Sequence, residues 1–124
     1  MPTLETVVDQ YLAIWNETNA DRRRALIAEI YADDATYSDP LAEVSGLAGI
    51  DALVAGAQAQ FPGLVFSLGG PVDTHHDVAR FSWHLGTSGA NEPLVVGFDV
   101  LALTSGRVSR VYGFLDKVPA TLSA

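Results

Sequence analysis

The chain of 124 residues carries 15 acidic and 7 basic side chains, a net charge of −8, and no cysteine. This length fits one domain with its own hydrophobic core, so we expect a single domain over residues 1–124. The acidic balance and the shortness of the one basic run, at residues 22–24, exclude a nucleic-acid interface. The missing cysteines exclude disulfides, thiol nucleophiles and thiolate zinc sites.

No segment has the composition of a signal peptide or a membrane anchor. Glu5 and Asp9 stand where a signal peptide would carry positive and then unbroken apolar residues, and no stretch approaches 18 uncharged apolar residues. We therefore expect a soluble, cytoplasmic protein that does not insert into membranes. The charged fraction of 18% and the mean hydropathy of +0.20 indicate more apolar surface than a monomer buries, so a homo-oligomer is expected.

Two helices are predicted in the first quarter of the chain. Apolar residues recur at helical spacing over residues 4–15, and Thr3 is placed to cap that helix. After a polar break, Asp21 is the expected cap of a second helix, whose apolar stripe covers residues 26–31. The arginines at 22–24 are expected on its solvated face.

A short strand and a third helix follow. Residues 35–38 read as a strand that stops at Asp39-Pro40, because proline lacks a ladder donor and restricts the residue before it. A polar loop with Gly46 and Gly49 is expected next. Apolar spacing then predicts a helix over residues 50–61, ended by a Pro-Gly pair.

From residue 64 onward the apolar period changes to two, which is typical of strands. A short strand is predicted near residues 64–68, and three long ones at about 78–88, 94–104 and 107–115. The short separators between the long strands favour antiparallel hairpins. This order predicts an α+β fold in which a curved antiparallel sheet forms a cone, with about three helices on its concave face. The apolar interior of the cone is the natural ligand site.

Asp99 interrupts a strand so apolar that both of its faces must be largely covered. A buried carboxylate is costly unless it is paired, hydrogen-bonded or protonated, so Asp99 is a candidate functional residue. Gly97, on the same face of the strand, leaves room for another group to approach. The alternative is a structural carboxylate that pairs with Arg80 or Arg110.

Two further polar residues lie on expected inner surfaces. Asp39 shares a strand face with Tyr37, and the following helix would cover it, although aspartate before proline is also common in simple turns. Tyr11 lies within the apolar stripe of the first helix, where a buried phenol needs a hydrogen-bond partner. The partner is a ligand oxygen, or Tyr11 is an ordinary core residue whose hydroxyl reaches the rim of the core.

The histidines do not indicate a metal site. His75 and His76 follow a Gly-Gly-Pro break and are expected at the surface in a hairpin turn, while His84 alternates with Trp83 along a strand. With three histidines and no His-x-x-x-His pair, we expect no catalytic metal. The chain also lacks a Gly-x-Ser-x-Gly elbow, a phosphate-binding loop and a dinucleotide fingerprint.

Three segments carry a family resemblance: VVDQYLAIWN, IYADDATYSDP with the later GLAGIDAL, and LVVGFDVLALTSGRVSRVYGF. They resemble the SnoaL-like polyketide cyclase and ketosteroid isomerase group of the nuclear transport factor 2-like superfamily. The resemblance implies one SnoaL-like domain over residues 1–124 with the cone fold. The same cone hosts isomerases, cyclases, dehydratases, epoxide hydrolases and proteins without chemistry. The Arg-x-Asp pattern expected of the epoxide hydrolases is missing, which disfavours that activity.

The resemblance also implies roles for three residues. Isomerases of this group use a carboxylate base that ends the first strand before a proline, which corresponds to Asp39. Their oxyanion pocket uses a tyrosine of the first helix and a protonated aspartic acid of a later strand, which correspond to Tyr11 and Asp99. The stretch between Tyr11 and Asp39 is about one helical turn longer here, so Trp15 is an alternative occupant of that space.

The sequence therefore predicts a small enzyme without a cofactor, an isomerase or a polyketide cyclase-like protein acting next to a carbonyl of an apolar substrate. Asp39 would be the base, and a neutral Asp99 and Tyr11 would donate hydrogen bonds to the enolate. Aromatic residues would form the substrate-binding walls: Trp15, Tyr37, Phe66 and Trp83.

Two alternatives remain at this point: a non-catalytic binder of a lipophilic metabolite, with Asp99 as its anchor, and a purely structural or dimerising module. The strands offer apolar groups on both faces, which predicts a homodimer formed through the sheet face that points away from the helices.

Overall fold

Three helices and seven strands make up the computed structural model, which describes residues 3–89 and 92–119. The helices are α1 (Leu4–Asn16), α2 (Ala20–Ile30) and α3 (Gly46–Gln60). The strands are β1 (Tyr31–Asp39), β2 (Ala42–Ser45), β3 (Val65–Leu68), β4 (Asp73–His75), β5 (Val78–Gly86), β6 (Val95–Thr104) and β7 (Arg107–Lys117). No helix in the described ranges is long and apolar enough to cross a membrane.

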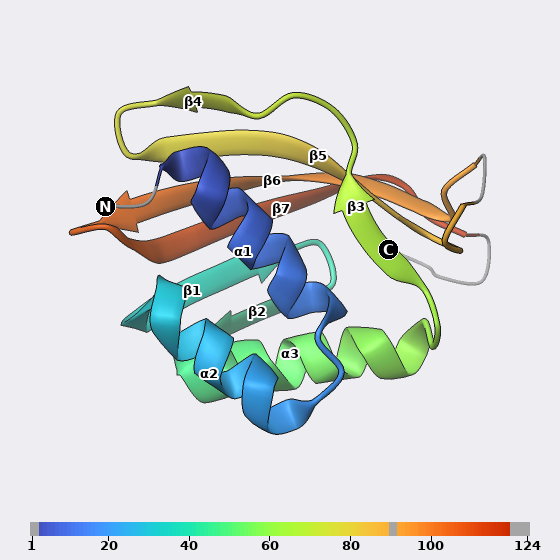
Figure 1. Ribbon diagram of the computed structural model, residues 1–124, viewed down its shortest axis with the longest axis horizontal. Coiled ribbons are helices and arrows are strands. Elements are labelled where there is room, and N and C mark those ends of the chain that lie inside the picture. The colour runs from blue at the N-terminus through green and yellow to red at the C-terminus, as the bar shows by residue number, and fades with distance from the viewer. Residues whose placement is uncertain (1–2, 90–91, 120–124) are drawn as a thin grey trace.

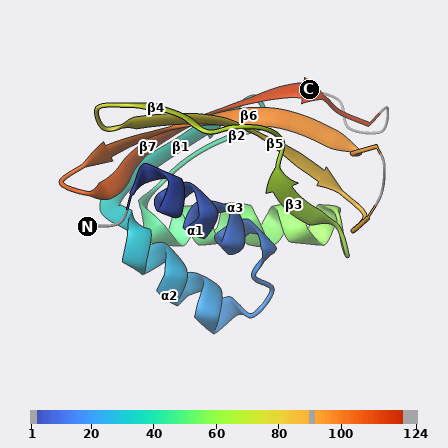
Figure 2. The same cartoon turned by 45° about the horizontal axis from the view of Figure 1, so that its top comes forward.

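The strands form one curved, open sheet, and the helices cover one of its faces (Figures 1 and 2). Helix α1 lies against β3 and β5, whereas α3 lies against β1 and β2. The concave side of the sheet therefore faces the helices, and the apolar core fills the space between them. This arrangement confirms the predicted α+β cone.

The strand order is β2-β1-β7-β6-β5-β3, and β4 pairs with the first three residues of β5. The two hairpins that join β5, β6 and β7 are antiparallel, as predicted. Strand β1, however, runs parallel to β7, so the sheet is mixed and not wholly antiparallel. After the β1–β2 hairpin and α3, the chain continues with β3 at the opposite edge of the sheet. Strands β5, β6 and β7 then follow in order towards β1, and β7 pairs with β1 in the parallel direction.

The starts of α1 and α2 show how local capping sets the helix bounds. Thr3 caps α1 as predicted, because its side chain accepts a hydrogen bond from the amide of Thr6. The prediction that Asp21 caps α2 was wrong: Asn19 does so, two residues earlier, by accepting from the amide of Arg22. Tyr31, expected in the helix, begins β1 instead and pairs with Val108 of β7. A strand partner distant in sequence decides that boundary.

The segment after Pro40 is a hairpin and not a loop. Strand β2 pairs with β1, and α3 begins at Gly46, four residues before the predicted start. Gly46 has a φ of +79°, a conformation that favours glycine, and so allows the chain to turn from strand into helix. Asp39 makes the β1–β2 turn by accepting hydrogen bonds from two backbone amides. The turn at Asp39-Pro40 therefore reverses the chain, and the sheet continues with β2.

Arg23 corrects the expectation that all three arginines of the basic run are solvated. Its side chain is buried, and Nε donates to Oδ1 of Asp51 on α3 at 2.6 Å. Its Nη1 donates to the side chain of Gln58 and to the carbonyl of Glu17. Gln58 in turn donates to the carbonyls of Trp15 and Glu17. This network joins all three helices at the end of α1.

Candidate active site

Asp99 lies in the middle of β6, and its side chain points to the concave side of the sheet. Only 4% of the surface of this residue is exposed to solvent. Both carboxyl oxygens accept a hydrogen bond. The Tyr11 hydroxyl donates to Oδ2 at 2.6 Å, and the indole nitrogen of Trp83 donates to Oδ1 at 3.1 Å. Neither arginine considered from the sequence pairs with it: Arg80 binds Asp73, and Arg110 is fully exposed.

Gly97, which has no side chain, leaves the space in which the Trp83 ring reaches Asp99. A side chain at Gly97 would clash with the carbonyl of Phe114 and would come within 2.5 Å of the Trp83 ring. Trp83 and Gly97 are paired across β5 and β6. The glycine predicted to leave room on this face thus accommodates the indole that binds Asp99.

Burial is the largest influence on the ionisation of Asp99 and raises its pKa to about 6, despite the hydrogen bonds from Tyr11 and Trp83, which lower it. The nearby charge of Asp39 raises the pKa further. Asp99 was expected to be neutral, and the direction of the shift agrees. Its size does not, since a pKa of about 6 leaves only about a tenth of the molecules protonated at pH 7.

Asp39 ends β1 and is held by three donors. Its Oδ2 accepts from the Tyr37 hydroxyl at 2.6 Å, and its Oδ1 accepts from the amides of Leu41 and Ala42 at 2.8 and 2.9 Å. Asp39 is thus a turn residue, as one interpretation of the Asp-Pro pair predicted. The same side chain also lines the cavity beneath the sheet, so the turn positions it there.

A cavity of about 360 Å³ lies between the sheet and helices α1 and α3. Its size is within the range of about 300–1,000 Å³ that is common for small-molecule sites. All seven residues that the sequence predicted for the site line it: Tyr11, Trp15, Tyr37, Asp39, Phe66, Trp83 and Asp99. Tyr11 and Trp15 both reach it, so the longer stretch after Tyr11 does not displace the tyrosine.

The wall formed by α3 was not predicted from the sequence. Ala52, Leu53, Gly56, Ala57 and Gln60 line the cavity from this helix. Small residues at helical spacing were the available signal, because they let a helix stand back from a sheet and leave space. Phe61 and Leu115 complete the apolar surface.

Gly113 on β7 lies close to the side chains of both acidic residues. A Cβ atom at this position would lie 2.9 Å from Oδ1 of Asp99, 3.1 Å from Cβ of Asp39 and 3.5 Å from the Tyr37 hydroxyl. The two acidic side chains therefore converge over a single glycine. Their proximity also explains why the charge of Asp39 affects Asp99.

Aromatic rings in contact form one side of the cavity. Trp15 lies 5.9 Å from Tyr37 and 5.3 Å from Phe66, and Phe66 lies 5.5 Å from Trp83, all measured between ring centroids. Phenols are protonated at neutral pH, and burial is the largest of the causes that raise the pKa of the Tyr11 and Tyr37 hydroxyls further.

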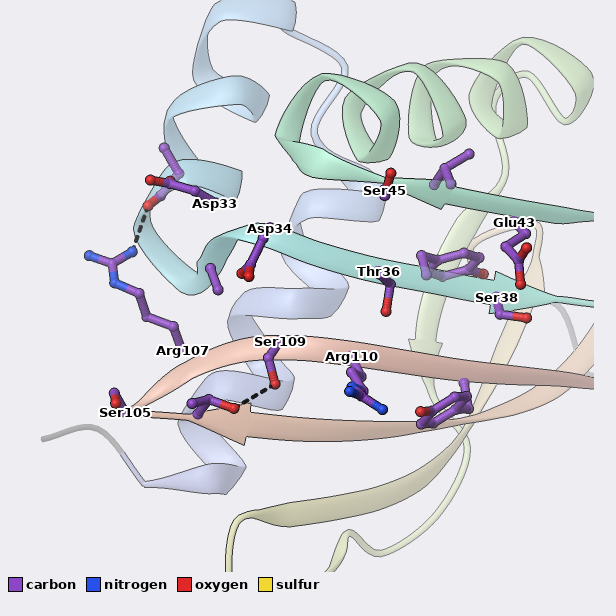
Figure 3. A pocket seen from close by; sticks show the side chains of 16 residues that line it. Asp33, Asp34, Thr36, Ser38, Glu43, Ser45, Ser105, Arg107, Ser109 and Arg110 are labelled. Atoms are coloured by element: carbon purple, nitrogen blue, oxygen red, sulfur yellow. Dashed lines mark hydrogen bonds between the residues drawn. The ribbon is translucent and has the colours of Figure 1, made fainter.

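A wider hollow of about 1,230 Å³ lies on the other face of β1, β2 and β7 (Figure 3). Hydroxyl and charged side chains line it, among them Thr36, Ser109 and Arg110. Arg107 at its edge binds the carbonyls at the end of α2. The buried Asp99 does not line this hollow, so it is not the candidate active site.

Comparison with known proteins gives a consistent family. The SnoaL-like domain family matches residues 8–111. A crystal structure of a candidate isomerase of the SnoaL-like family from Agrobacterium tumefaciens is 40% identical, covers 90% of this chain and 95% of its own, and has a TM-score of 0.85.

More distant structures share the fold. A candidate ketosteroid isomerase from Kribbella flavida is 20% identical, with a TM-score of 0.68 and coverage of 96% of this chain and 82% of its own. A candidate polyketide cyclase from Sinorhizobium meliloti is 18% identical, with a TM-score of 0.69 and coverage of 91% and 94%. No curated protein matches the chain.

Proposed function

This chain belongs to the SnoaL-like family, and we propose that it removes a proton next to the carbonyl of an apolar small molecule, leading to isomerisation or ring closure. One observation carries the proposal. The side chains of two acidic residues, Asp39 and Asp99, both come close to Gly113 and line one cavity whose remaining walls are mainly apolar and aromatic. Two acids in different surroundings can divide the roles of base and hydrogen-bond donor between them.

Asp39 is the proposed base. Its Oδ1 accepts hydrogen bonds from two backbone amides. Its Oδ2 accepts a hydrogen bond only from the Tyr37 hydroxyl and so retains a lone pair that can take a proton. Oδ2 would take the proton, and the electrons of the broken C–H bond would form the enolate double bond. The proton then returns to another carbon in an isomerisation. In a ring closure, the enolate carbon attacks a second carbonyl, the π electrons of that carbonyl move to its oxygen, and this oxygen takes the proton from Asp39 to become a hydroxyl group.

Asp99 and Tyr11 are the proposed donors to the enolate oxygen. Asp99 can donate only when it carries a proton, and its raised pKa makes that form accessible near neutral pH. A carbonyl compound that enters the cavity excludes water, which favours the neutral acid further. Protonation of Asp99 also frees the Tyr11 hydroxyl from a carboxylate, so that both groups can turn to the ligand.

Deuterium exchange tests the proposal without knowledge of the natural substrate. Cyclic ketones that quench the tryptophan fluorescence are incubated with the protein in D₂O, and exchange at the carbon next to the carbonyl is followed by NMR. We expect exchange well above the buffer rate, with loss in Asp39→Asn and a smaller loss in Tyr11→Phe. Binding of these ketones with exchange only at the buffer rate would contradict the proposal.

One observation favours a second candidate, a non-catalytic binder of lipophilic metabolites. The Tyr11 hydroxyl and the Trp83 indole nitrogen are both committed to Asp99, which leaves neither free for a ligand while Asp99 is ionised. A binder needs only the apolar cavity. In the same experiment, bound ketones would then show no enhanced exchange.

We also propose that the chain forms a homodimer through the outer face of the sheet. Phe98 and Phe114 stack there with ring centroids 4.8 Å apart, and Phe114 and Tyr112 are 48% and 42% exposed. Covering these rings would remove apolar surface from water. Light scattering is expected to give twice the chain mass of 13.2 kDa, and Phe114→Glu to halve it. A wild-type particle of 13.2 kDa at micromolar concentration would contradict this proposal.

A further inference from the structure

The charge balance of the cavity is one-sided. Asp39 and Asp99 both line it, and none of the described residues around it is an arginine, lysine or histidine. Neither carboxyl group takes part in any ion pair found within the described ranges. Their hydrogen bonds satisfy the oxygens, but no positive charge offsets the negative one.

The other polar groups that face the cavity are neutral. Helix α1 presents the Tyr11 hydroxyl, α3 presents the Gln60 amide, β1 presents the Tyr37 hydroxyl, and β5 presents the Trp83 indole. Both phenols are protonated at neutral pH, and burial raises the pKa of each further. The net charge of the groups that line the cavity is therefore negative at pH 7 and above, and it comes from Asp39 and Asp99.

Aromatic rings supply a second attraction for positive charge. Trp15, Tyr37, Phe66 and Trp83 adjoin one another along the wall, with neighbouring centroids 5.3–5.9 Å apart. The faces of such rings attract cations, and tryptophan does so best. Two uncompensated carboxyl groups and an aromatic wall in one cavity favour a ligand with an apolar body and a positive charge.

We infer that the cavity binds hydrophobic organic cations, meaning amines or quaternary ammonium ions, with the charge beside Asp39 and Asp99. This inference concerns a ligand class and does not depend on the proposed reaction. A neutral ligand of the same shape displaces water and leaves two unpaired charges in an apolar space, whereas a cation neutralises one of them. A cation is thus preferred over its uncharged counterpart.

The chain contains its own reporter for this binding. It has two tryptophans, Trp15 and Trp83, and both line the cavity, so quenching of their fluorescence follows occupancy directly. The probes are benzyltrimethylammonium and neopentylbenzene, which has the same shape without the charge. At pH 8 we expect the cation to bind at least about tenfold more tightly, given close contact between opposite charges of low exposure.

Two comparisons, one between two pH values and one between wild type and a variant, test whether the cation binds beside the carboxyl groups. Lowering the pH from 8 to 5 protonates most of Asp99 and is expected to weaken cation binding several-fold. Neopentylbenzene binding is expected to change in the opposite direction, because a neutral Asp99 loses less solvation when the ligand displaces water. Asp99→Asn is expected to weaken it similarly at pH 8. The matched control is Asp9→Asn, which removes the same charge from the exposed side of α1 and is expected to change nothing.

Equal affinity for the two probes at pH 8 would overturn the inference, as would cation binding that is unaffected by pH. The pH comparison uses the wild-type protein and so does not depend on whether Asp99→Asn folds. Failure here is separate from failure of the proposed function, because ketone exchange is measured without any cation. Exchange without cation binding would overturn this inference alone.

Discussion

Two charged side chains are buried among the described residues, and they are compensated differently. Arg23 lies between helices and binds Asp51 at 2.6 Å. Asp99 lies at the cavity, where its partners are the neutral Tyr11 and Trp83. The fold thus pairs the buried cation fully and leaves the buried acid without an opposite charge.

The comparison suggests how to distinguish a structural charge from one that is available for chemistry. A paired ion is locked in one protonation state, and its energetic role is to hold its neighbours in place. An unpaired buried acid has a pKa moved towards neutrality, so that it can gain or lose a proton under ordinary conditions.

The largest expected effect is on activity at the cavity. Asp39→Asn removes the proposed base, and the rate of ketone exchange is expected to fall by about 10²–10⁴-fold. Asp51→Asn, in the helix network, is the control and should leave the exchange rate of the folded protein within a fewfold of wild type. Equal losses of activity in both variants would abolish the proposed distinction.

The largest expected effect on stability is at Arg23. Arg23→Met leaves Asp51 with little compensation in a site where its side chain is 14% exposed, and should lower the free energy of unfolding by about 3–5 kcal/mol. Urea denaturation measures the loss. The double variant Arg23→Met, Asp51→Leu is expected to recover most of it, since no charge is then left unpaired. A single variant as stable as wild type would show that the ion pair does not hold the helices together.

Asp99 is expected to behave in the opposite way. Its folded pKa is raised, so the folded state binds more protons than the unfolded chain between about pH 4 and 6. The contribution of Asp99 to stability is therefore present at low pH, is lost as the pH rises to about 6, and costs up to about 3 kcal/mol above that.

Asp99→Asn removes this titration and keeps an oxygen that can accept a hydrogen bond. Its stability at pH 7 is expected to equal or exceed that of wild type, and its dependence on pH between 4 and 6 to flatten. Urea denaturation at pH 4 and pH 7 measures both. Clear destabilisation at pH 7 would argue that Asp99 is a structural carboxylate after all.

The smallest expected effect concerns the pH profile and sharpens the role of Asp99. As a donor it must be protonated, so kcat/KM for a responsive ketone should fall about tenfold per unit as the pH rises above about 6. A base would produce the reverse, a rise through the same pKa. A rising profile that is lost in Asp99→Asn would transfer the role of base from Asp39 to Asp99.

Much of the fold follows from local pattern. The apolar stripes of α1 and α3 and the alternation along β5, β6 and β7 are visible in the sequence, because each needs only the period of its own backbone. The residues around the cavity were visible for a related reason. Tyr11 and Asp99 are polar groups within apolar patterns, and such exceptions stand out without any knowledge of their neighbours.

Tertiary structure decided which partners these residues meet. Arg23 reads as one of three exposed arginines until α3 places Asp51 and Gln58 beside it. The parallel pairing of β1 with β7 joins segments far apart in the chain. The pKa of Asp99 depends on its burial, on the hydrogen-bond donors that α1 and β5 place beside it, and on the charge of Asp39. Sequence periodicity determines which face of an element is buried, but charge compensation and ionisation depend on distances between elements, which only long-range packing sets.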